Sequence, residues 1–184
     1  MFRSRRVAQK VCALSLLAFF ALAGYSGGPV VQAANGGGVL ESMTGSGHFT
    51  GSNGEFVSFA HNAVKHADGT VTGNYVIHLR SLDATFKGPI TCLAVVGNHA
   101  WAGGVAEEVT SDNPNLAALE GQEMWFQVID NGEGANDPPD ITTSIGVTPV
   151  GGPAGQAQAY CDAMPQPRFP LLVEKGNIQV RDDQ

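Results

Sequence analysis

The sequence predicts an all-β domain, a single antiparallel β-barrel or β-sandwich of about eight strands. Runs of β-branched and aromatic residues recur at short intervals, with Gly, Pro, Asn and Asp between them. No apolar pattern of helical period extends over more than about 12 residues. The 24 glycines among 184 residues suit a chain with many turns. The spacing of the strands does not separate a barrel from a sandwich.

Residues 1–33 are predicted to be an export signal. The first ten residues carry four basic groups and no acid, residues 11–23 carry no charge, and small residues stand at Val31 and Ala33. This order is what a signal peptidase substrate requires, with cleavage after Ala33. The apolar run rises only about 20 Å as a helix, whereas the hydrocarbon core is roughly 30 Å thick. We therefore expect a secreted or periplasmic protein with no membrane anchor after signal cleavage.

The acidic charge of the remaining chain argues against two classes of partner. The whole chain has 10 Lys and Arg against 17 Asp and Glu, and removal of the signal leaves six basic and 17 acidic groups, a net charge of −11. Proteins that bind nucleic acid or anionic membranes need clustered Lys and Arg. The expected partner is instead an extracellular ligand or surface.

A flexible Ala- and Gly-rich lead over residues 34–46 is predicted to precede a single β-domain over residues 47–184. Cys12 belongs to the signal, which leaves Cys92 and Cys161 as a pair in an oxidising compartment. Such a pair predicts a disulfide, which stabilises the fold by about 4 kcal/mol when it closes a loop of about 70 residues. The alternative is two free thiols, with Cys92 as a small core residue.

Residues 55–66 and 70–80 predict a hairpin with Asp68-Gly69 as a two-residue turn. This register pairs His61 with Val76 and leaves His61 on the solvent side. The opposite face is the more apolar one and is expected to point into the core; it carries Phe56, Ala60, Val64, Val71, Tyr75, Ile77 and Leu79.

The remaining strands are expected at 83–87, 89–96, 99–110, 122–130, 141–149 and 171–180. Residues 113–121 predict one short helix, with Asn113 as its cap and Pro114 in its first position. Residues 151–168, rich in Gly and Pro, are expected to form a loop.

Residues 130–140 form the densest polar stretch, and their carboxylates belong to Asp130, Glu133, Asp137 and Asp140. Hard oxygen ligands on a Gly-rich loop are what Ca²⁺ prefers, so a calcium site is one hypothesis for this loop. The spacing does not match an EF-hand. The alternative is a structural turn, because Asn-Gly and Asp-Pro favour tight bends and Asp side chains accept bonds from nearby N–H groups. No other cofactor is expected.

No catalytic constellation is found, so no residue is assigned as catalytic. No serine after the signal lies in a G-x-S-x-G turn, and the adjacent Glu107 and Glu108 would point to opposite faces of a strand. If the domain were a small barrel enzyme, a hydrolase or isomerase with an internal pocket, the first acid and base candidates would be Asp130, Asp137 and His78.

Five phrases stand together in this order: GHFT at 47–50, HADGTVTG at 66–73, CLAVVGN at 92–98, DNGEGANDPPD at 130–140 and GNIQV at 176–180. Together they resemble a family of uncharacterised secreted bacterial β-rich proteins over most of residues 47–180. The resemblance implies a compact extracytoplasmic β-domain. It brings no catalytic residue or ligand with it.

The leading hypothesis is a secreted, non-enzymatic module that binds a ligand or surface through the loops between its strands. The alternatives are the small barrel enzyme and a structural protein of the envelope or matrix. A deep pocket with convergent polar groups of shifted pKa would favour the enzyme.

Overall fold

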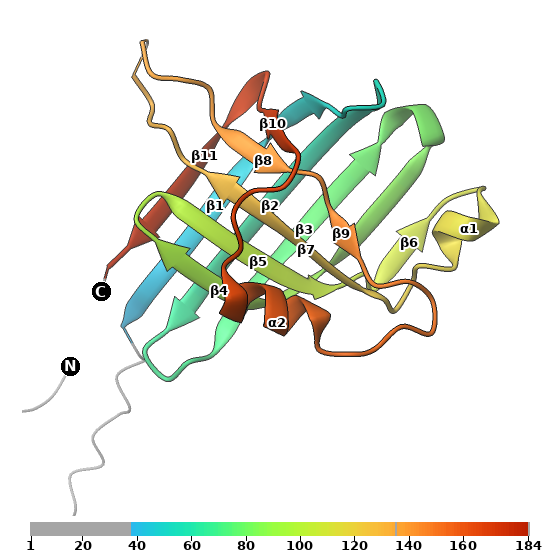
Figure 1. Cartoon of the computed structure of the whole chain (residues 1–184), viewed down its shortest axis with the longest axis horizontal. Helices are drawn as coiled ribbons and strands as arrows, with labels where there is room; N and C mark the ends of the chain where they lie inside the picture. The colour runs from blue at the N-terminus through green and yellow to red at the C-terminus, as the bar shows by residue number, and fades with distance from the viewer. Residues whose placement is uncertain (1–37, 135, 184) are drawn as a thin grey trace, which may run out of the picture. The chain divides into compact units, whose positions relative to one another are not determined.

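The computed structural model describes residues 38–134 and 136–183, so the predicted signal peptide lies outside the described residues. One curled antiparallel sheet forms a half-barrel, which confirms the all-β fold class (Figure 1). The strands are β1 (Val39–Thr50), β2 (Phe56–His66), β3 (Val71–Leu79), β4 (Ala84–Val96), β5 (His99–Val105), β6 (Glu108–Thr110), β7 (Glu123–Ile129), β8 (Ile141–Thr143), β9 (Gly146–Val147), β10 (Pro170–Leu172) and β11 (Lys175–Asp182). The short helices are η1 (Arg80–Leu82), α1 (Pro114–Ala117) and α2 (Gln156–Ala163).

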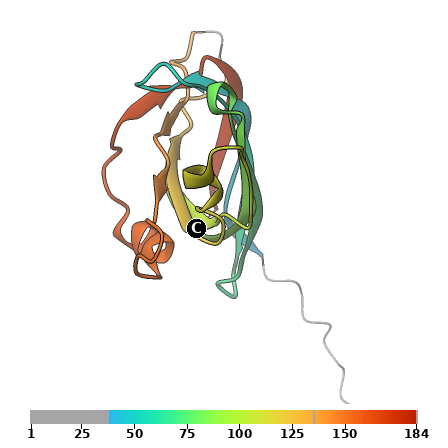
Figure 2. The same ribbon diagram turned by 90° about the vertical axis from the view of Figure 1, so that its right-hand side faces the viewer.

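The sheet folds over on itself to enclose the core. Its strand order is β10-β8-β7-β5-β4-β3-β2-β1-β11, with β6 on β4 and β9 on β7. The first half of β4 pairs with β3 and β6, and its second half pairs with β5. We call β1, β2, β3, β6, β11 and the first half of β4 the back leaf. The front leaf comprises β5, β7, β8, β9, β10 and the second half of β4, and the two leaves face one another in Figure 2.

The bend in β4 lies at Gly88-Pro89, where the sequence predicts a break between two strands. A Cβ on Gly88 would lie 1.8 Å from the carbonyl oxygen of Val105, and one on Gly104 would lie 1.9 Å from that of Pro89. Only glycine permits this approach of backbone to backbone. The interruption is therefore a bend inside one long strand, and it is the place where the chain passes from one leaf to the other.

The β2–β3 hairpin is present, but the predicted register is wrong by one residue, because His61 pairs with Tyr75. The loop has three residues: the N–H of His66 donates to the carbonyl of Thr70, and Gly69 takes a φ of 85°. The Asp68 carboxylate accepts bonds from the N–H and the hydroxyl of Thr70. A three-residue loop with glycine in the left-handed region is the other common hairpin turn compatible with Asp-Gly.

The slip of one residue inverts the predicted face of β2. The side chains that β2 turns into the core are Val57, Phe59, His61 and Ala63. Phe56 and Ala60, predicted to be inside, are exposed. On β3 the predicted face is correct, since Tyr75 and Ile77 are buried. Alternation along a strand makes the whole face depend on a single residue in the turn.

Strand β1 begins at Val39, so much of the predicted flexible lead, residues 34–46, is strand. It pairs with β2 on one side and β11 on the other. Its two glycines reflect close packing: a Cβ on Gly45 would lie 2.9 Å from Nε2 of His61, and a Cβ on Gly47 would lie 2.4 Å from the carbonyl oxygen of Lys175. Composition alone does not distinguish such a strand from a flexible segment.

Residues 151–168, predicted to form a loop, contain α2. The Glu123 carboxylate of β7 accepts bonds from the N–H groups of Gly155 and Ala157 at 2.9 and 3.0 Å. These bonds hold the pKa of Glu123 below its ordinary value. Because the cap comes from a distant strand, the sequence around α2 carries no start signal of the usual kind.

The predicted disulfide joins Cys92 of β4 to Cys161 of α2, which confirms the pairing. The predicted cap of α1 is also correct, since the Asn113 side chain accepts a bond from the N–H of Asn115 at 3.0 Å. Among residues 38–134 and 136–183, neither of the α-helices is long and apolar enough to cross a bilayer.

Candidate functional site

The open end of the half-barrel contains a cavity of about 390 Å³, which we call the end cavity. Both leaves contribute long apolar side chains to it. Those that come from the strands are Phe49, Val57, Leu79, Phe86, Met124, Val147 and Leu171. Its volume and apolar lining are those of a site for a small molecule.

Short connections close the sides of the end cavity. Leu82 follows β3 in η1, Leu116 and Leu119 come from α1 and the turn after it, and Ile145 lies between β8 and β9. Leu82 is 45 % exposed although its side chain is large and apolar. An exposed leucine beside an apolar cavity gives the entrance a surface that an apolar ligand can cover.

The charged group at the end cavity is Glu55, at the end of the β1–β2 turn. This carboxylate is only 9 % exposed and accepts a bond from the N–H of Ser81 at 2.8 Å. The Asn53 side chain holds the turn by accepting from the N–H of Glu55. Glu55 thus supplies one fixed charged acceptor in a lining whose other polar residues are Ser52, Asn53 and Ser144.

Deeper between the leaves, His61, Tyr75 and Phe126 surround a void of about 10 Å³ that shares Phe49 and Ile145 with the end cavity. The His61 ring stacks on Phe59 at 5.3 Å and packs against Phe126 at 5.4 Å. Sequence reasoning placed His61 in solvent, but it is 6 % exposed because of the register slip. A volume of this size holds about one water molecule.

Of the buried side chains of His61 and Tyr75 in this inner region, one has a hydrogen-bond partner and the other has an atom without one in the described part of the chain. Burial lowers the pKa of His61 to about 4, so its ring is neutral at pH 7, and its Nε2 atom is buried with no hydrogen-bond partner among the described residues. The Tyr75 hydroxyl donates to the sulfur of Met124 at 3.2 Å, and burial raises its pKa. A buried nitrogen without a partner lowers the stability of the fold.

The carboxylates of the predicted calcium loop lie against the outer edge of β11. Asp140 accepts bonds from the N–H of Ile178 at 2.7 Å and of Asn131 at 2.9 Å. Asp130 accepts from the N–H of Val180 at 2.9 Å. We call these contacts between Asp130, Asp140 and β11 the carboxylate seam. It joins the front leaf, through the loop that follows β7, to the edge of the back leaf.

The other two residues of the predicted calcium site lie nearby but do not converge with the first two. Glu133 accepts bonds from the side chains of Asn177 and Gln179, which hold its pKa below the ordinary value. Asp137 accepts from the N–H of Gly134 inside the loop. Within the part of the chain that the structure describes, no three His, Cys, Asp or Glu side chains form a group that could hold a metal ion. Calcium binding by this loop stays a prediction.

The three acid and base candidates from the sequence do not share a cavity. Asp130 belongs to the carboxylate seam, and Asp137 lies in an exposed turn. His78 lies 3.8 Å from Asp83 at the opposite end of β3 from the hairpin turn. The residues that line the end cavity were missed as a set, because those on strands alternate like ordinary core positions and the others come from short connections that are distant in the sequence.

Comparisons with protein-family models, with curated proteins and with solved structures find no match to this chain, so the resemblance to secreted bacterial β-rich proteins stays a prediction.

Proposed function

We propose that the protein is a non-enzymatic binding module that takes an apolar small molecule into the end cavity. The observation that carries the proposal is the cavity itself, about 390 Å³ of space lined by aliphatic and aromatic side chains from both leaves. Burial of about 200 Å² of apolar ligand surface contributes roughly 5 kcal/mol before the entropy of association is subtracted.

The chemistry of the lining narrows the class of ligand. Glu55 offers a carboxylate that already accepts one backbone bond, so a ligand hydroxyl or amine that donates a hydrogen bond is favoured there. A ligand carboxylate is disfavoured by the same charge. The ligand is therefore apolar, and neutral or basic at its polar end.

Two features support a binding role over catalysis. The acid and base candidates Asp130, Asp137 and His78 lie in separate environments, and the titratable side chains of the inner void are a neutral histidine and a buried tyrosine. General acid and base catalysis needs such groups within hydrogen-bond reach of one reacting atom. Binding requires only the shape and the apolar lining.

Fluorescence of the neutral probe N-phenyl-1-naphthylamine tests the proposal. We expect saturable enhancement on addition of folded protein, and loss of at least about tenfold in affinity in Leu119→Trp, whose indole fills the cavity. Val150→Trp, at a position 64 % exposed in a loop, is the matched control and keeps the wild-type affinity. Absence of saturable binding, or equal affinity in both variants, would exclude the end cavity as a ligand site.

We also propose that the protein acts outside the cytoplasm. The disulfide supports this location, because such bonds persist in oxidising compartments. Amino-terminal sequencing of material exported by the producing cell is expected to begin at Ala34. A mature chain that keeps residues 1–33 would contradict the predicted signal.

A further inference from the structure

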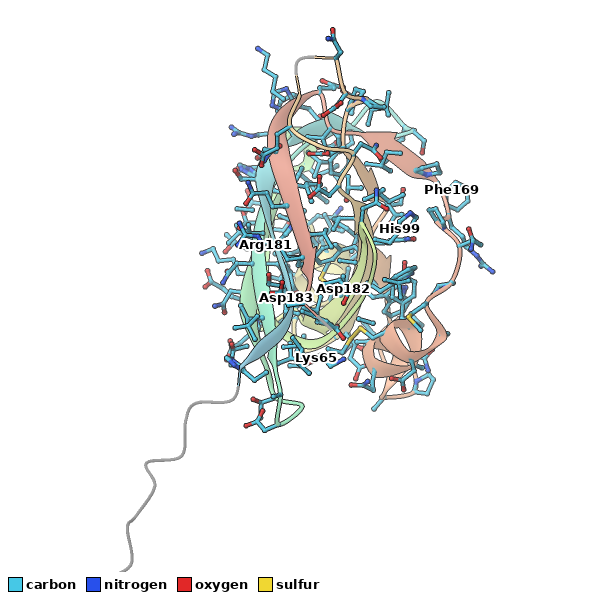
Figure 3. The ribbon with its side chains drawn as sticks, turned by 90° about the vertical axis from the view of Figure 1, so that its left-hand side faces the viewer. Lys65, His99, Phe169, Arg181, Asp182 and Asp183 are labelled. Carbon is cyan, nitrogen blue, oxygen red and sulfur yellow. A yellow bond between two sulfur atoms is a disulfide. The ribbon has the colours of Figure 1, made fainter. Side chains whose placement is uncertain are left out.

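A second site lies outside the front leaf. After α2 the chain continues as residues 164–169, a segment that we call the strap, and returns to the sheet at β10. Figure 3 shows the strap running outside the front leaf, with Phe169 on it. Between strap and sheet is a cleft of about 420 Å³, which we call the strap cleft. Ser144 and Ile145 line both this cleft and the end cavity, so the β8–β9 connection separates the two.

Three aromatic rings line the strap cleft. Trp125 of β7 lies across Gly146, where a Cβ would come within 2.2 Å of its indole ring. Tyr160 of α2 lies with its ring 6.1 Å from that of Trp125. Phe169 completes the lining from the strap and is 71 % exposed. Broad aromatic rings provide flat apolar faces for a ring-shaped ligand.

Polar groups converge between these rings. Thr143 and Ser144 bring hydroxyls from the front leaf, and Arg168 brings a guanidinium from the strap. Burial raises the pKa of Tyr160. A hydrogen bond with Thr143 and the charge of Arg168 each lower this pKa, though by less than burial raises it. Arg168 therefore lies close enough to act on the Tyr160 hydroxyl.

The guanidinium of Arg168 is available to a ligand. Among residues 38–134 and 136–183, no carboxylate lies within 4.0 Å of it in an ion pair, whereas Lys65 and Lys87 each hold a glutamate at 2.9 Å. None of the residues that line the cleft is acidic, although acids outnumber bases in the chain by 17 to 10. A cation in a cleft without a carboxylate is complementary to an anionic ligand.

The strap is held at several points, so the cleft is formed before a ligand arrives. The disulfide fixes α2, the Trp101 indole donates to the carbonyl of Pro165 at 2.9 Å, and Ser144 N–H donates to the carbonyl of Phe169. Met164 and Phe169, which bound the strap, take φ values of 43° and 52°. Left-handed conformations are costly for such side chains, and these two residues lie where the chain leaves α2 and where it returns to the sheet.

We propose that the strap cleft binds a uronic acid residue of an acidic glycan, with the sugar ring against the aromatic side chains and its carboxylate on Arg168. The hydroxyls of Ser144 and Tyr160 match the hydroxyls of a sugar, which a simple aromatic acid lacks, whereas the buried Thr143 hydroxyl already accepts from the N–H of Gln127 and positions Tyr160. This site is separate from the end cavity and does not depend on the proposed function.

Calorimetric titration with trigalacturonate tests the proposal, with its methyl-esterified form and benzoate as comparison ligands. We expect trigalacturonate to bind, and the uncharged ester and benzoate to bind at least about tenfold more weakly. Arg168→Gln should lose at least about tenfold in affinity and Phe169→Ala a few-fold. The matched controls are Arg80→Gln, and Phe56→Ala at another exposed phenylalanine; both should keep the wild-type affinity.

Three results would overturn the proposal: no heat of binding with folded protein, an affinity unchanged in Arg168→Gln, or benzoate binding as tight as trigalacturonate. Leu119→Trp separates this site from the end cavity, since it should abolish binding of the naphthylamine probe and leave trigalacturonate binding unchanged. Thermal unfolding of each variant checks that the fold is retained.

Discussion

Two segments near the carboxyl terminus, α2 and β11, are attached to the rest of the molecule by different chemistry. A covalent bond between Cys161 and Cys92 holds α2 against the outside of the front leaf. On β11 the backbone ladder with β1 holds one side, and the carboxylates of Asp130 and Asp140 hold the other. The disulfide thus attaches a layer to one leaf, whereas the carboxylate seam joins the two leaves to each other.

This difference separates two kinds of stabilisation. A disulfide acts largely by restricting the unfolded chain, so its contribution grows with the loop that it closes. The carboxylates act in the folded state, because they satisfy N–H groups of Ile178 and Val180 that would otherwise be unpaired at the edge of the sheet. The predictions below test each attachment and the core between the leaves.

The largest effect is expected from removal of the disulfide. The double variant Cys92→Ala, Cys161→Ala should lower the free energy of unfolding by about 4 kcal/mol, since the bond links residues 69 positions apart. Urea unfolding monitored by circular dichroism measures this. The double variant should also lose trigalacturonate binding, because α2 anchors one end of the strap. A loss below about 1 kcal/mol would contradict the role given to this bond.

A change of pH tests the core between the leaves. The unfolded chain protonates His61 below about 6.5, whereas in the folded protein burial delays protonation until about pH 4. Protons therefore favour the unfolded chain, and the free energy of unfolding should fall by up to about 3 kcal/mol as the pH drops through this window. His61→Leu should flatten the dependence between pH 6.5 and 4. An equal slope in the variant and the wild type would show that other groups cause it.

The carboxylate seam is tested by Asp140→Ala. This variant leaves the N–H of Ile178, a residue with no exposed surface, without its acceptor, and we expect a loss of about 2 kcal/mol in urea unfolding. Asp137→Ala is the matched control in the same loop. It removes one exposed bond to Gly134 and should cost roughly 0.5 kcal/mol. Equal losses in the two variants would mean that the contact with β11 is not what Asp140 contributes.

Much of the fold could be predicted from local chemistry. The number of cysteines after the signal is enough to predict Cys92–Cys161, and Asn113-Pro114 marks the start of α1. Turn residues between β-rich runs predict the antiparallel sheet. Asp68-Gly69 predicts the hairpin but is compatible with loops of two or three residues, so it cannot determine which face of β2 is buried. The wrong prediction that His61 faces solvent followed from that one ambiguity.

What could not be predicted depends on contacts between distant segments. The cap that Glu123 gives α2, and the bonds of Asp130 and Asp140 to β11, involve backbone groups 32 or more positions away. The sequence marks residues 130–140 as the densest polar stretch, but the bonds of Asp130 and Asp140 to β11 depend on a strand that is distant in the sequence. Likewise, Trp125, Tyr160 and Arg168 come from a strand, a helix and the strap, so no sequence motif brings them together.

The carboxylate seam also has a consequence for contacts between molecules. The main path of the sheet ends at β10 and β11, and unpaired N–H groups on such an edge are a template onto which another chain can add. On β11 the outward N–H groups of Ile178 and Val180 are already bonded to Asp140 and Asp130. At the other edge, β10 has only three residues and begins with Pro170, which has no N–H to offer. The same carboxylates that join the leaves therefore also occupy N–H groups through which another chain could add to β11.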